Sequence, residues 1–73
     1  MIDFEWDWGK ASANLAKHGI DFADATEVLF DPMAMTVTDA ETEEERFVTI
    51  GADAVSRIIE VAFTRLEDRI RII

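Results

Sequence analysis

Cysteine is absent from this chain of 73 residues, and several other chemically useful residues are scarce. Without cysteine there is no disulfide framework and no thiolate that could bind a metal ion or attack a substrate. His18 is the only histidine, so a histidine general base has to be this residue. The sequence also lacks a glycine-rich phosphate loop, metal-ligand spacings and a Ser/His/Asp order. We therefore expect neither a metal ion nor a cofactor.

Long apolar runs are missing as well. The longest are a few residues, far short of the roughly 18 needed to span a membrane. Residues 1–5 lack the basic start and apolar run of a signal peptide. By default, these features predict a soluble cytoplasmic protein without a membrane partner.

The composition nevertheless predicts a folded protein. Hydrophobic residues make up 49% of the chain, which is too apolar for a disordered segment. The length leaves room for a single domain, residues 1–73, whose core alone supplies roughly 3–5 kcal/mol. A partner subunit or self-association is therefore expected.

Positive charge is scarce in the first part of the chain. Residues 1–45 hold 12 acidic residues against two lysines, whereas residues 46–73 hold five arginines against four acidic residues. The net charge of −9 argues against a nucleic-acid binder. The cationic chemistry is concentrated in the second half and is all arginine.

The hydrophobic pattern predicts an α+β fold. Residues 2–6 alternate between apolar and acidic, as in a strand. Two helices follow: the first is capped by Asp7 and ends at Gly19, and the second is capped by Asp21 and ends before Pro32. The short connection between them predicts a helical hairpin. Four further strands follow, at 33–38, 46–50, 57–64 and 69–73, with an acidic loop at 39–45. Short connections favour an antiparallel meander with the helices on one face. Two short helices should leave part of the sheet uncovered, which calls for another chain or a further helix.

Arg69 and Arg71 are the strongest candidates for binding phosphate. They alternate with isoleucines, so both emerge on one side of the last predicted strand, and Arg46 opens another strand. Guanidinium groups make bidentate bonds to phosphate and stabilise spreading negative charge. The alternative is cross-strand pairing with Glu60 or Glu67.

Other candidates have a structural interpretation of equal or greater weight. His18 and Lys17 could move protons or hold a phosphate, but His18 also ends the apolar stripe of the first helix and Lys17 fits a solvated helix face. The acidic loop is either solvated or docks on a basic partner. Trp6 and Trp8 favour the core over base stacking.

These residues resemble, in combination and order, the BrnT family. The shared positions cover nearly the whole chain: Phe4 to Asp7, Lys10, Asn14, Lys17 to Gly19, Phe22, Ala25, Phe30 to Pro32, Glu45 to Phe47, Ile50, Gly51 and Arg69 to Ile72. The resemblance implies a RelE-like fold and a ribonuclease toxin that halts translation without a metal ion. It also implies an RNA substrate and neutralisation by the BrnA antitoxin. The toxin would contact DNA only indirectly, through this antitoxin.

The departures from the family pattern shape the expectations. Family members continue beyond the last strand into a basic C-terminal helix, which this sequence lacks, and Trp8-Gly9 replaces a proline-containing helix start. Arg46, Arg69 and Arg71 would stabilise charge, and Lys17 or His18 would handle protons. The alternative function is an inactive or truncated binding module that still docks an antitoxin, with assembly into a homo-oligomer or a toxin–antitoxin hetero-oligomer.

Overall fold

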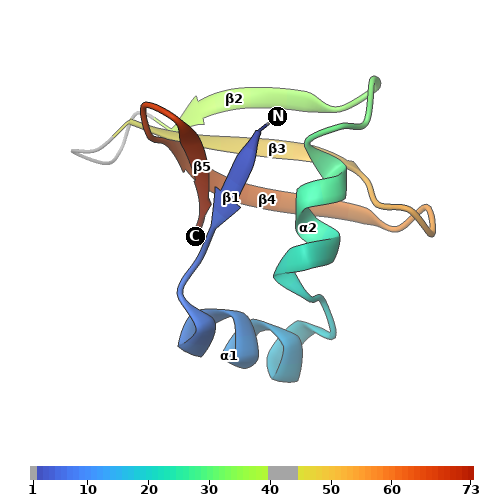
Figure 1. Ribbon diagram of the computed structural model, residues 1–73. Helices are drawn as coiled ribbons and strands as arrows, with labels where there is room; N and C mark the ends of the chain where they lie inside the picture. Colours follow the sequence, from blue (N-terminus) through green and yellow to red (C-terminus); the bar gives the residue numbers. More distant parts are fainter. Residues whose placement is uncertain (1, 40–44) are drawn as a thin grey trace.

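The computed structural model describes residues 2–39 and 45–73. It contains the elements in the expected order (Figure 1): β1 (Asp3–Glu5), α1 (Trp8–His18), α2 (Phe22–Val28), β2 (Met35–Asp39), β3 (Arg46–Ala52), β4 (Ile58–Arg65) and β5 (Arg69–Ile72). The prediction of an α+β fold is confirmed. Most of the predicted acidic loop, residues 40–44, lies outside the described residues.

Side-chain caps fix where the helices begin and end. The Asp7 carboxylate accepts a hydrogen bond from the Lys10 amide, and that of Asp21 accepts one from the Ala23 amide. Both bonds satisfy amide groups that a first helical turn leaves unpaired. Gly19 ends α1 with a φ of 70°, a left-handed conformation that glycine adopts without a steric penalty. In Figure 1, α1 and α2 run in different directions from this turn.

The sheet has the strand order β1-β5-β4-β3-β2. Strands β2 to β5 form the expected antiparallel meander. β1 joins as an edge strand parallel to β5, with Asp3 opposite Arg69 and Glu5 opposite Arg71. This parallel pairing makes the sheet mixed and brings the two ends of the chain together.

α2 packs against one face of the sheet, as expected, and α1 adds a single buried residue, Ala11, to the same core. The buried apolar side chains come from both helices and three positions of β4, with one from β5: Ala11, Phe22, Ala25, Val28, Ile59, Val61, Phe63 and Ile72. The residues between them on the strands point to the other face, because side chains alternate along a strand. That face carries Met35, Val37, Ile50 and Ile58, all of them exposed.

The expectation for the α1 stripe and for Trp8 was wrong. Only Ala11 of this helix is buried, whereas Trp8 is 75% exposed and Leu15 is 48% exposed. Figure 1 gives the reason, because α1 lies across the end of the sheet instead of along its face. Trp6 does pack against the core, and its ring meets that of Trp8 edge-on.

Two carboxylates hold the connections between the elements. Asp31 accepts hydrogen bonds from the amides of Ala52 and Met33, which lower its pKa. It thereby joins the end of α2 to β3, beside Gly51, where an added Cβ would lie 2.8 Å from that of Ala34. Asp53 in the β3–β4 turn is buried, which acts to raise its pKa. Hydrogen bonds from the Arg57 amide, the Arg57 guanidinium and the Val55 amide outweigh the effect of burial, so the pKa of Asp53 is lowered.

The core predicts a position-dependent cost for one substitution. Val28 is 0% exposed, whereas Val55 in the β3–β4 turn is 72% exposed. We expect Val28→Ala to lower the free energy of unfolding by about 2 kcal/mol, since it removes buried methyl groups and leaves a cavity. Val55→Ala is the matched control and should change it by less than about 0.5 kcal/mol. Equal shifts in thermal melts of the two variants would contradict this description of the core.

The lowered pKa values of Asp31 and Asp53 predict acid sensitivity. Each folded-state pKa lies below the model-compound value of 3.8. As the pH falls, the two carboxylates bind protons in the unfolded chain at a higher pH than in the folded chain. Their contribution to the free energy of unfolding is therefore complete well above pH 4 and is lost as the pH falls through the lowered folded-state pKa values. Asp53→Asn should be less stable than the parent at pH 7 and should lose less on going to pH 3. Denaturant unfolding at both pH values tests this, and an unchanged pH dependence would speak against it.

Candidate functional site

Three arginines lie on the open face of the sheet. Register pairs place Asp39, Arg46, Thr64, Arg71 and Glu5 in one row across all five strands. Arg46 and Arg71 flank Thr64, two strand spacings or about 10 Å apart at the backbone. Arg69 lies two residues from Arg71 on the same face. The structure therefore brings together the three arginines that the sequence nominated.

Glu5 connects two of these arginines. The Arg69 Nε donates to Glu5 Oε1, and the Arg71 Nη1 lies 3.5 Å from Glu5 Oε2. The Arg69 Nη1 also donates to Asp68, at 2.7 Å. The hydrogen bond to Glu5, followed by that to Asp68, raises the pKa of Arg69. Arg69 is thus held by two carboxylates and Arg71 more loosely by one.

The predicted alternative partners of the arginines were wrong. Neither Glu60 nor Glu67 forms an ion pair with Arg69 or Arg71 within residues 2–39 and 45–73. Arg46 likewise makes no ion pair with any residue that the structure describes. Among the three arginines of the open face, Arg46 and Arg71 are therefore held by carboxylates less firmly than Arg69 within the described residues.

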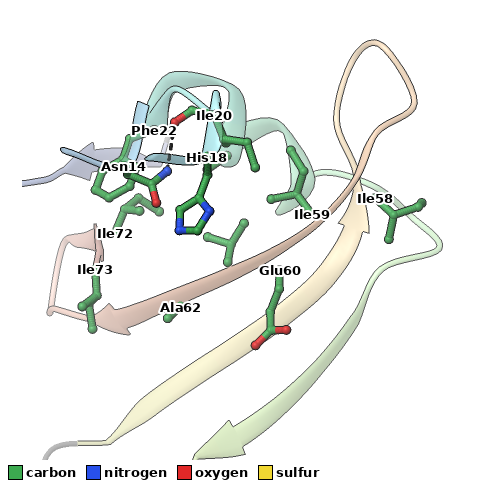
Figure 2. Close-up of a pocket in the computed structure, with 12 residues that line it drawn as sticks. Asn14, His18, Ile20, Phe22, Ile58, Ile59, Glu60, Ala62, Ile72 and Ile73 are labelled. Carbon is green, nitrogen blue, oxygen red and sulfur yellow. Dashed lines mark hydrogen bonds between the residues drawn. The ribbon is translucent and has the colours of Figure 1, made fainter. Parts of the chain in front are cut away.

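Lys17 and His18 occupy a different part of the molecule. Both are exposed at the end of α1, on the side of the sheet that the helices cover. Figure 2 shows His18 pointing toward β4, where it lines a groove with Phe22 and Ile72. The five nominated residues therefore form two groups, three arginines on the open face and two residues on the helical side.

Glu5, the carboxylate that contacts both Arg69 and Arg71, was not among the residues predicted from the sequence. The alternation of Asp3 and Glu5 with apolar residues predicts only the outer face of a half-buried strand. Once β1 is known to pair with β5, the acidic positions Asp3 and Glu5 lie opposite Arg69 and Arg71 in register, which would identify Glu5 as their partner. Local periodicity does not contain that pairing.

The arrangement on the open face suits a phosphodiester. Two guanidinium groups can bind phosphate oxygens, and the Glu5 carboxylate beside Arg71 adds a proton acceptor. Thr64, which lies between the two arginines, is buried. Across residues 2–39 and 45–73, no three His, Asp or Glu side chains gather where they could hold a metal ion. No helix in the described chain is both long and apolar enough to cross a membrane.

Comparison with known protein families places the chain in one family. The model of the family described as "Ribonuclease toxin, BrnT, of type II toxin-antitoxin system" matches residues 6–73, which include β5 and all three arginines. A search of curated proteins returns no match. A match over nearly the whole length shows membership, and the chain therefore belongs to the BrnT family of ribonuclease toxins of type II toxin–antitoxin systems.

Proposed function

We propose that the open face of the sheet is the ribonuclease site and that it cleaves RNA without a metal ion. The observation that carries this proposal is the cross-strand row in which Arg46 and Arg71 flank Thr64 and end at Glu5. A rigid sheet holds the backbones of these residues in fixed register, so little conformational entropy is lost when they bind a phosphate.

The chemistry uses the RNA itself as nucleophile. The 2′-hydroxyl attacks the adjacent phosphorus, the bond to the 5′-oxygen breaks, and a 2′,3′-cyclic phosphate and a 5′-hydroxyl result. Glu5 accepts the proton of the 2′-hydroxyl, and the departing 5′-oxygen takes a proton from water. Arg46 and Arg71 stabilise the charge that develops on the phosphate oxygens. DNA lacks the 2′-hydroxyl and should be spared.

The wider role follows from family membership. As a type II toxin, the chain is a toxin with an antitoxin protein as its partner. We propose that the partner is of the BrnA type, that RNA cleavage in the cytoplasm halts translation, and that DNA is contacted only through the antitoxin. The RelE-like assignment belongs to the same proposal, supported by an antiparallel meander whose core is shared with two N-terminal helices.

A second function competes with catalysis. The net charge of −9 opposes RNA binding, and Glu5 and Asp68 already neutralise part of the arginine cluster. Both features favour a chain that binds its antitoxin without cutting RNA. Incubation of the purified chain with labelled RNA, with and without EDTA, separates the two functions: cleavage products in both conditions support the ribonuclease, and intact RNA supports the binding module.

The arginines give the first test of the site. We expect Arg46→Lys and Arg71→Lys to slow RNA cleavage by about 100- to 1,000-fold, because lysine keeps the charge but loses the fork that binds two oxygens. Arg65→Lys is the matched control, since Arg65 lies on the helical side with its guanidinium 5.2 Å from the centre of the Phe47 ring. Thermal melts exclude unfolding as the cause. Full RNA-cleavage activity in both variants would show that the open face is not the ribonuclease site.

Glu5 gives the second test. Glu5→Gln keeps the size of the side chain but not its ability to accept the proton, so kcat should fall by about 100- to 10,000-fold. Asp68→Asn removes the other carboxylate partner of Arg69, an exposed residue outside the cross-strand row, and should leave kcat within a few-fold of the parent. An active Glu5→Gln variant with an unchanged pH–rate profile would show that another group accepts the proton.

A further inference from the structure

Strand β2 carries its apolar side chains on the open face of the sheet. Met35 and Val37 lie on this face and are 72% and 58% exposed. Thr36 and Thr38, whose side chains alternate with them, lie on the helical side instead. A sheet that is covered on one face normally shows the reverse, with apolar residues toward the core and polar residues toward water. The sequence of β2 therefore puts apolar surface on the open face, where the core does not use it.

The neighbouring strands extend this surface into a continuous aliphatic strip (Figure 1). Val37 is in register with Val48 of β3, which pairs in turn with Ala62 of β4. Met35 is in register with Ile50, which is 48% exposed. These five residues form the aliphatic strip, two uncharged rows that run across the strands. A contiguous exposed apolar surface marks a binding site more often than a scattered apolar residue does.

The aliphatic strip lies directly beside the arginines of the proposed ribonuclease site. Arg46, Val48 and Ile50 alternate along the same face of β3, so successive rows are about 7 Å apart. The first apolar row is thus one step from the row that holds Arg46, Thr64 and Arg71. Across three strands, each apolar row spans about 10 Å. The strip is therefore large enough for the flat face of one nucleobase.

A nucleotide has the chemistry that this combination of surfaces requires. Its base presents a flat face without hydrogen-bonding groups, which packs on methyl groups through dispersion and the removal of apolar surface from water. Its phosphate is an anion and finds guanidinium groups one row away. A second copy of this chain fits less well, because each copy carries a net charge of −9 and the copies repel each other.

We propose that the aliphatic strip is a nucleobase subsite, which takes the unstacked base of a nucleotide next to the phosphate that is cleaved. This inference rests on the proposed ribonuclease activity of the open face and adds the class of substrate. That class is single-stranded RNA, whose bases can be unstacked and splayed out. In a duplex, neighbouring base pairs cover both faces of each base. A purine covers more of the strip than a pyrimidine and should bind more tightly.

The test follows methyl groups by NMR while RNA is added. The probe is a short single strand of 2′-methoxy adenosines, which cannot be cleaved, and the chain carries ¹³C-labelled methyl groups on valine and isoleucine. A base that lies flat on a methyl group shifts the methyl signal upfield through its ring current. We expect upfield shifts at Val37, Val48 and Ile50. We expect none at Val55, which is 72% exposed in the β3–β4 turn.

Three further nucleic acids separate the base from the phosphate. An abasic strand has the same phosphates without bases, so it should shift the arginine Nε signals and leave the valine and isoleucine methyl signals in place. A duplex of the adenosine strand with 2′-methoxy uridines should also give no upfield methyl shift. A single strand of 2′-methoxy uridines should give smaller shifts and bind about threefold more weakly than the adenosine strand, because its bases cover less apolar area.

Variants of the strip complete the experiment. Val37→Thr replaces a methyl group by a hydroxyl group at nearly constant shape, and Val55→Thr makes the same change in the turn. Val37→Thr combined with Ile50→Thr should weaken binding of the adenosine strand by about tenfold, but that of the abasic strand by less than about twofold. Val55→Thr should change neither affinity.

The outcomes distinguish failure of the subsite from failure of the ribonuclease site. Arginine shifts without upfield methyl shifts, or equal binding of the adenosine and abasic strands, would overturn the nucleobase subsite and assign the strip to a protein partner. Both results would leave the ribonuclease site intact. Unchanged Nε signals of Arg46 and Arg71 would instead contradict the ribonuclease site, and the subsite with it.

Discussion

The parallel pairing of β1 with β5 is the contact on which the proposed site depends. It joins Glu5 to Arg69 across 64 positions of the sequence, with both helices and three strands between them. Closing such a long loop costs conformational entropy, which local contacts cannot repay. Ion pairs from Glu5 and the edge-on packing of Phe4 against Phe30, with ring centres 5.9 Å apart, stabilise this pairing. Loss of this strand would remove both the proposed proton acceptor and the partner that orients Arg71.

The same pairing reconciles an acidic protein with an arginine-based site. β5 places two arginines on the open face of a chain that is negative as a whole, and the acidic residues of β1 opposite them offset part of that positive charge. Arg46 lies in the same row on the other side of Thr64, and it forms no ion pair with a described residue. Local complementarity, not net charge, decides binding at short range, because salt screens the more distant charges.

Much of the fold was predictable because its signals are local. Asp7, Gly19 and Asp21 act where the sequence placed them, and the alternation of Arg69 to Ile72 gave the correct face for both arginines. Trp8 and Leu15 were misplaced, since helical periodicity cannot tell whether the sheet extends far enough to cover a helix. The position of Glu5 beside the arginines depends on which strands become neighbours in the sheet. That information arises only from the assembled sheet.

The most direct test of the central claim is to find where RNA binds. A short RNA with 2′-methoxy groups cannot be cleaved, and it can be titrated into the labelled chain while the arginine Nε and histidine ring signals are followed by NMR. We expect shifts at the Nε groups of Arg46 and Arg71 and at the Thr64 amide, with the His18 ring unaffected. Shifts at His18 and the α1 amides, with the open-face arginines unchanged, would contradict it.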